Sequence, residues 1–145
     1  TPYRLLLEEK LLVPSNFYEI AWQPHANSKF YYEYLKKLGV KTVSLEEFQS
    51  SDFKFQIKEI LSNLNSQFST FWGFDVDSVR ASDAPGTSAP SPIGLTSEDF
   101  VTLSKIAGEY EQTRLIEFTE ANPNYDIDNR TAKLVAIAMY YSIQK

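Results

Sequence analysis

Apolar side chains recur at three- and four-residue steps in several stretches of this 145-residue chain, and this spacing constrains its fold more than any other feature. Such a repeat is typical of an amphipathic helix that buries one face. The clearest stretches run from Phe53, from Phe100 and from Leu134, and each follows residues that can cap a helix. The pattern predicts a mainly α domain of about five or six helices, with an α+β domain as the alternative.

Capping and breaking residues set the bounds of the expected helices, and three short stretches between them leave room for a small β element. Residues 17–22, 40–43 and 74–79 could be its strands, although 17–22 is too short to distinguish a strand from a helical turn. The expected helices are residues 3–13, a helix between Ser28 and Gly39, one opened by the capping box Ser44–Glu47, 53–72 behind Asp52, 96–121 behind Thr96 and Asp99, and a last helix capped by Asp128 and Asn129.

A stretch poor in charge and rich in Pro, Ser and Ala precedes the last two expected helices. Residues 81–95 read ASDAPGTSAPSPIGL and hold three of the seven prolines. This composition favours neither a helix interior nor a strand ladder, so it predicts a loop or linker. We expect an N-terminal helical or mixed subdomain over residues 1–80, the linker over 81–95, and a C-terminal helical hairpin over 96–145 that packs on 1–80 as one domain.

The composition excludes several classes of protein. With no cysteine and a single histidine, the chain cannot form disulfides, thiolate zinc sites or sites with two imidazoles. The net charge of −5 argues against nucleic acid as a partner, because phosphate contacts need a basic surface. No apolar run reaches the roughly 18 residues of a membrane span, so we expect a soluble protein that is cytoplasmic by default. The first residue is Thr1, which we interpret as a truncated or processed N-terminus that leaves the compartment open.

Aromatic and basic side chains gather between Phe17 and Lys41. Flat rings beside cations can stack on a planar ligand, and they are also common at surfaces that bind another protein. The simplest interpretation is a helix that buries its rings and exposes its lysines, with a protein-binding surface and a nucleic-acid surface as alternatives. The candidate ligand- or partner-binding residues are Trp22, His25, Tyr31, Tyr34, Lys37 and Trp72.

Two further features could carry chemistry. His25 lies in a loop where an imidazole could act as a general base, but no nucleophile motif or second histidine accompanies it. Asp75 and Asp77 would share one face of a strand and could serve as acid and base or as metal ligands. Because no third group stands at a defined spacing from them, we interpret this pair as a solvated face.

Three functions remain open from the sequence. The first is a non-catalytic protein-interaction or regulatory module, because no complete catalytic constellation is visible and aromatic residues make up 14% of the chain. Its partner would be another protein or a second copy of the chain, with no cofactor and no metal. The second is a domain that binds a small molecule or peptide in an aromatic pocket between the helices 28–38 and 53–72, with Trp22, Tyr31, Tyr34 and Trp72 as its walls. The third is an enzyme that uses carboxylates and His25.

Overall fold

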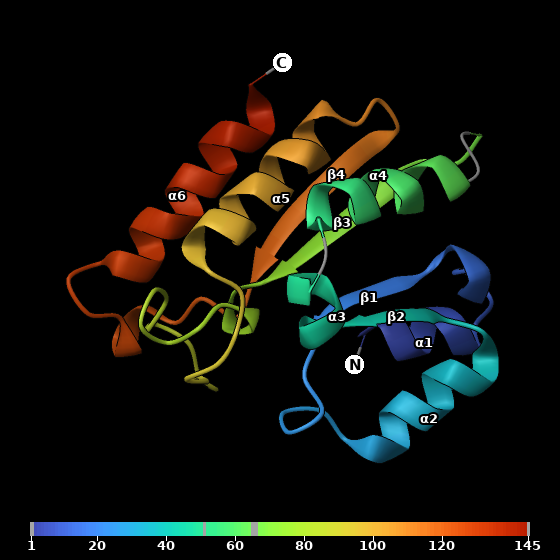
Figure 1. Ribbon diagram of the computed structural model, residues 1–145, viewed down its shortest axis with the longest axis horizontal. Helices are drawn as coiled ribbons and strands as arrows, with labels where there is room; N and C mark the ends of the chain where they lie inside the picture. Colours follow the sequence, from blue (N-terminus) through green and yellow to red (C-terminus); the bar gives the residue numbers. More distant parts are fainter. Residues whose placement is uncertain (1, 51, 65–66, 145) are drawn as a thin grey trace. The chain divides into compact units, whose positions relative to one another are not determined.

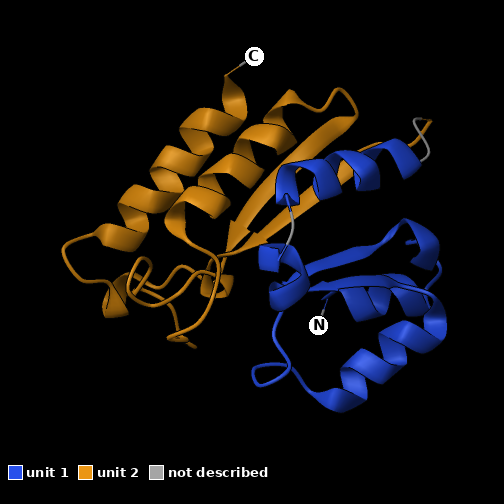
Figure 2. Ribbon diagram, in the orientation of Figure 1, with its two compact units in different colours: residues 1–65 blue, residues 66–145 orange. Residues whose placement is uncertain are grey.

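The chain, seen in a computed structural model that describes residues 2–50, 52–64 and 67–144, forms two compact units. Residues 1–65 make unit 1 and residues 66–145 make unit 2 (Figure 2). The Pro-rich stretch 81–95 lies inside unit 2. Each unit contains one pair of parallel strands together with its own helices (Figure 1). Among the described residues, no helix combines the length and the apolar character needed to span a bilayer.

Unit 1 is built around a βαβ motif. Strands β1 and β2 pair in parallel, with Tyr18 opposite Lys41 and Trp22 opposite Ser44, and helix α2 connects them. The register shifts between Ile20 and Trp22, where the ladder contains one extra residue. The elements are α1 (Pro2–Glu8), the 3₁₀ helix η1 (Pro14–Asn16), β1 (Tyr18–Trp22), α2 (Lys29–Leu38), β2 (Lys41–Ser44), α3 (Leu45–Ser50) and α4 (Phe53–Asn63).

Unit 2 repeats the same plan. Strands β3 and β4 pair in parallel, helix α5 connects them, and helix α6 follows β4 (Figure 1). Three aromatic rings form its centre: Phe74 stacks on Phe118 at 5.2 Å between centroids and meets the edge of Phe100 from α5 at 5.4 Å. The elements are β3 (Thr70–Asp75), the 3₁₀ helix η2 (Val76–Ser78), α5 (Ser97–Glu109), β4 (Thr113–Thr119), the 3₁₀ helix η3 (Pro123–Tyr125) and α6 (Arg130–Ile143).

The fold class is α/β, so the expected mainly α class and its α+β alternative are both wrong. Two stretches predicted as single helices each contain a helix and then a strand: 53–72 holds α4 and the start of β3, and 96–121 holds α5 and β4. Short apolar runs match both the helical repeat and the alternation of a strand. The hydrogen-bonded pairing between β3 and β4 favours the strand in both stretches. In β4, the alternate residues Ile116 and Phe118 are more covered than Leu115 or Glu117.

The predicted capping motifs agree with the structure better than the predicted helix lengths do. Glu47 accepts a hydrogen bond from the backbone N–H of Ser44 at 2.7 Å, which confirms the first capping box. Asp52 caps α4, and Thr96 and Asp99 form the capping box that opens α5, as predicted. These motifs can be recognised in the sequence because the two residues of each motif lie within three positions of each other.

Three other expectations need correction. Ser28 makes no side-chain capping bond to α2. Asn129 occupies the N-cap position of α6, as predicted, but makes no side-chain capping bond; Asp126 accepts instead from the backbone N–H groups of Thr131 and Ala132, each at 3.0 Å. The expected helical hairpin over 96–145 is interrupted by β4, so α5 and α6 run in the same direction (Figure 1). The three possible strand stretches fare better: 17–22 and 40–43 overlap β1 and β2, and 74–79 overlaps the end of β3.

The contact between α5 and α6 depends on Gly108. A Cβ atom at this position would fall on the backbone carbonyl of Ser142 in α6, so only a glycine allows the two helices to approach this closely. Both residues lie near the C-terminal ends of their helices, which agrees with the shared direction of α5 and α6.

We predict that Gly108→Ala lowers the free energy of unfolding by about 1–3 kcal/mol, because the added methyl group must push α5 and α6 apart. Alanine favours helices over glycine by about 1 kcal/mol, so a gain in stability would contradict the close approach. Chemical denaturation followed by circular dichroism measures the difference. Glu109→Ala, on the exposed side of the same turn, is the control and should change stability by less than about 0.5 kcal/mol.

Candidate functional site

Three acidic side chains lie at the carboxyl ends of β3 and β4 in unit 2. Asp75 is the last residue of β3 and pairs in register with Thr119, the last residue of β4. Asp77 follows in η2, and Glu120 follows β4 directly. Because the carboxyl ends of parallel strands meet at one edge of a sheet, the topology brings together acids that are more than forty residues apart in the sequence. This edge is where open parallel sheets bind ligands.

The turn after β3 fixes the first two acids close together. The backbone N–H of Asp77 donates to Oδ1 of Asp75 at 3.1 Å, and the Ser78 hydroxyl donates to the backbone carbonyl of Asp75 at 2.6 Å. Val76, between the two acids, is fully buried and anchors the turn in unit 2. Both carboxylates are therefore held on the same short segment.

The electrostatics of this edge favour a cation. Desolvation, followed by the charge of Asp77 and with a smaller contribution from Glu120, raises the pKa of Asp75 to about 7. Asp75 keeps an exposed surface, so water screens part of this effect. The crowding of like charges is the part that a bound cation would relieve, and carboxylate oxygens are ligands that hard divalent cations prefer.

Glu120 has an unusual backbone conformation. Its φ angle is +63°, in the left-handed region that costs a non-glycine residue free energy. The next residue, Ala121, pairs in an antiparallel bridge with Thr87 of the Pro-rich stretch. The strained turn and this bridge hold Glu120 at the same edge as Asp75.

The stretch 81–95 forms a tightly bonded loop at this edge rather than a flexible linker. Gly86 donates its N–H to the buried Thr131 hydroxyl at 2.7 Å and accepts from the N–H of Asn122 at 2.7 Å. Ala84 and Thr87 are buried as well. The loop thereby connects the turn after β3 to the start of α6 and rigidifies the surroundings of the three acids.

Asp83 is the main polar anchor of that loop. Its carboxylate accepts from Arg80 Nε at 2.9 Å, from the backbone N–H of Ser97 at 2.9 Å and from the Ser82 hydroxyl at 2.9 Å. Burial works in the opposite direction, yet these hydrogen bonds lower the pKa of Asp83 to about 2. The charged form therefore stabilises the loop.

The candidate residues chosen from the sequence fall into separate groups. Trp22, Tyr31 and Tyr34 line one pocket in unit 1, whereas Trp72 lies on β3 in unit 2 and donates its Nε1–H to Thr113 Oγ1 at 2.9 Å. The four residues expected to wall one pocket between helices 28–38 and 53–72 thus divide between two units, and that pocket stays a prediction. The side chains of His25 and Lys37 are exposed. No ligand or partner tests these six residues, and their roles stay predictions.

The acids at the strand ends carry little signal in the sequence. The spacing of Asp75 and Asp77 predicts a solvated face, and no motif gives Glu120 a role. The missed signal is that an Asp-x-Asp segment ends one strand while a glutamate ends another. That signal is readable only if 113–119 is recognised as a strand rather than as part of a helix.

Comparison with known proteins identifies the family to which this chain belongs. The family model described as the arginase family matches residues 1–144. The chain belongs to the arginase family. Within this family it is 28% identical over 148 residues to the formimidoylglutamase of Macrococcus caseolyticus, a match that covers 100% of this chain and 45% of that protein. It is 30% identical over 127 residues to the formimidoylglutamase of Staphylococcus carnosus, covering 87% of this chain and 41% of that protein.

Solved structures of the arginase family agree. The formimidoylglutamase of Bacillus subtilis has a TM-score of 0.94 at 26% identity, covering 99% of this chain and 45% of that one. The crystal structure of Trypanosoma cruzi formiminoglutamase with Mn²⁺ has a TM-score of 0.91 at 25% identity, covering 99% of this chain and 47% of that one. The chain thus spans about half the length of the relatives it matches.

These comparisons overturn the leading functional expectation. The leading expectation of a non-catalytic interaction or regulatory module is wrong, and so are the expectations of a helical protein-binding domain and of a chain that is more likely not an enzyme. The family and the matched relatives carry the names of enzymes. The third hypothesis, an enzyme that uses carboxylates, agrees better with the family. The expected partners, another protein or a second copy of the chain, stay predictions.

We predict that Asp83→Asn lowers the free energy of unfolding by about 1–2 kcal/mol at pH 7, after allowance for solvent screening. Because the pKa of Asp83 is lowered on folding, its contribution is complete above the ordinary pKa of 3.8 and is lost as the pH falls through about 2. The difference between the native chain and the variant should therefore shrink between pH 4 and pH 2. Urea denaturation across this range measures it, with the exposed Glu111→Gln as control, and a constant difference would contradict the assignment.

Proposed function

We propose that this chain forms part of the catalytic domain of a metal-dependent hydrolase of the formimidoylglutamase type. The observation that carries the proposal is the cluster of Asp75, Asp77 and Glu120 at the carboxyl edge of parallel strands, in a member of the arginase family. The names of its relatives support a substrate with a formimidoyl group on glutamate. A cytoplasmic location, expected from the sequence, belongs to the same proposal.

The acids fit part of a manganese site. Carboxylate oxygens suit Mn²⁺, the ion with which the Trypanosoma cruzi relative was crystallised, and the crowded charges of Asp75 and Asp77 need a cation for relief. Within the part of the chain that the structure describes, no group of three histidine, cysteine or acidic side chains is arranged to hold a metal. The proposal is therefore that Asp75 and Asp77 supply some of the ligands and that other residues of the enzyme supply the rest. It replaces the sequence expectation of no cofactor.

The acids and the loop would have different roles at such a site. A bound divalent cation supplies a water molecule that is more acidic and more nucleophilic than bulk water. Asp75 and Asp77 would hold the cation, and the hydrogen bond from the Asp77 backbone N–H to Oδ1 of Asp75 orients the Asp75 carboxylate within that turn. Glu120 places a further negative charge at the edge, suited to the positively charged N–H groups of a protonated formimidoyl substrate. The loop 81–95 keeps this edge rigid.

The role proposed from the sequence for His25 is not part of this account. His25 is an exposed residue of unit 1, on the loop between β1 and α2, while the three acids belong to unit 2. The carboxylates carry the proposal without it, and a role for His25 as a general base stays a prediction.

We predict that Asp75→Asn and Asp77→Asn each weaken Mn²⁺ binding by more than about 100-fold, since loss of a residue that only supports a metal ligand already costs 10- to 100-fold. Isothermal titration calorimetry with Mn²⁺ on the purified protein measures the affinity. Asp128→Asn, which removes an exposed carboxylate from the same unit, is the matched control and should leave the affinity unchanged.

The variants also test the catalytic part of the proposal. Hydrolysis of formimidoylglutamate should fall together with Mn²⁺ affinity in both Asp variants and stay near the native rate in Asp128→Asn. Mn²⁺ affinity that is the same in the native protein and in both Asp variants would rule out the site. Intact Mn²⁺ binding without any hydrolysis of formimidoylglutamate would instead rule out the substrate assignment.

A further inference from the structure

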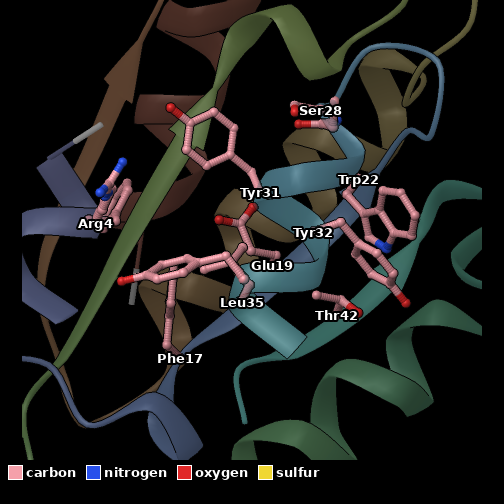
Figure 3. A pocket seen from close by; sticks show the side chains of 12 residues that line it. Arg4, Phe17, Glu19, Trp22, Ser28, Tyr31, Tyr32, Leu35 and Thr42 are labelled. Carbon is pink, nitrogen blue, oxygen red and sulfur yellow. The ribbon is translucent and has the colours of Figure 1, made fainter. Parts of the chain in front are cut away.

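Unit 1 contains a pocket of about 150 Å³ that the proposed function does not use (Figure 3). It lies over the face of β1 that carries Glu19, and residues of α1, α2 and β2 complete its wall. Six of its lining side chains are aromatic: Tyr3, Phe17, Trp22, Tyr31, Tyr32 and Tyr34. A liquid water molecule occupies about 30 Å³, so the pocket has room for a small organic group of a few heavy atoms.

A bulge in β1 builds this pocket. In a regular strand Glu19 and Trp22 would point to opposite faces, because side chains alternate. Here the register shifts between Ile20 and Trp22, and the buried Ala21 takes a φ angle of +62°. The extra residue turns Trp22 to the same face as Glu19, so both line the pocket. The left-handed alanine thereby brings a carboxylate and an indole into the same wall.

Glu19 is the one acidic side chain in the wall of this pocket, and it has no cationic partner among the described residues. The other charged lining residue, Arg4, gives its Nε–H to Glu8 at 2.7 Å instead. Figure 3 shows Glu19 in the middle of the pocket, with Arg4 to one side and Trp22 to the other. Burial raises the pKa of Glu19, as expected for a carboxylate that lacks a counter-charge.

The rings around Glu19 already attract cations. The guanidinium carbon of Arg4 lies 5.7 Å from the centre of the Tyr34 ring, and Lys36 Nζ lies 6.0 Å from the centre of the Tyr32 ring. Trp22 stacks on Tyr32 with 4.4 Å between ring centres, which presents a broad aromatic surface. Planar guanidinium groups stack on such surfaces and also pair with carboxylates through two parallel hydrogen bonds.

We propose that this pocket binds a small organic cation with a planar guanidinium or amidinium head group, held by the Glu19 carboxylate and stacked among the aromatic rings of the wall. The aromatic rings supply cation–π attraction and exclude water, and the carboxylate supplies charge and orientation. The volume limits the bound part to the head group and a short alkyl stem. The site lies wholly within unit 1 and is independent of the proposal for Asp75 and Asp77.

Titration with methylguanidinium tests this inference, with N-methylurea as an uncharged molecule of nearly the same shape. Isothermal titration calorimetry should detect methylguanidinium but not N-methylurea. Glu19→Gln should weaken methylguanidinium binding by at least about 10-fold, because it removes the charge and keeps the shape. Glu33→Gln, which removes an exposed carboxylate from α2, is the matched control and should bind as the native chain does.

Two further measurements place the ligand and guard against misfolding. In a Trp72→Phe background Trp22 is the remaining tryptophan, so its fluorescence should change on adding methylguanidinium and not on adding N-methylurea. Tyr31→Leu, which removes a half-exposed ring from the wall, should weaken binding several-fold even if Glu19→Gln unfolds. Equal responses to the two ligands, or native affinity in both Glu19→Gln and Tyr31→Leu, would overturn the inference. Neither result depends on Mn²⁺, so failure here is distinguishable from failure of the proposed hydrolase activity.

Discussion

The parallel pairing of β3 with β4 is the constraint on which the candidate site depends. A parallel pair needs a crossover, and α5 supplies it, so the chain returns to the same end of the sheet before β4 begins. Both strands then end at one edge, with Asp75 opposite Thr119. Had residues 113–119 continued α5 as a helix, Glu120 would not follow the end of a strand paired with β3. The register of one strand pair therefore decides whether three separate acids form a cluster.

The surroundings of the cluster show why these acids can tolerate one another. Like charges at short range raise the free energy of the folded state unless a cation or protons offset them. Unit 2 stabilises the surroundings through hydrogen bonds and one ion pair: Gly86 anchors the loop 81–95, and Asp83 accepts from three donors, one of them Arg80. The scaffold is thus rigid where the acids are crowded, a balance typical of sites that are arranged for binding rather than for stability.

Features encoded by neighbouring residues can be predicted from this sequence, whereas features that depend on long-range strand pairing cannot. The caps at Ser44, Asp52 and Thr96 were predictable because donor and acceptor lie within one helical turn. The strand β4 was not, because its apolar residues also match a continuation of α5, and only pairing with β3 decides between the two.

Only part of the candidate site can be predicted from the sequence, for the same reason. Asp75 and Asp77 can be recognised in the sequence as possible metal ligands, but no local signal connects the third acid, Glu120, to them. The aromatic residues Trp22, Tyr31 and Tyr34 were singled out together and do line one pocket, although the bulge at Ala21 that turns Trp22 inward cannot be read from the residue types. Its cause is a single left-handed alanine, a conformation that sequence rules reserve for glycine.

The most direct test of the central claim is paramagnetic broadening of the amide NMR signals of the protein by Mn²⁺. Because the effect falls steeply with distance from the ion, the account predicts selective loss of the amide signals of residues 75–78 and 119–121 at low Mn²⁺ concentration. The amides around the exposed acid Glu111 should persist. Broadening spread evenly over the acidic residues of the surface, or centred away from the ends of β3 and β4, would contradict a divalent cation site built by this strand pair.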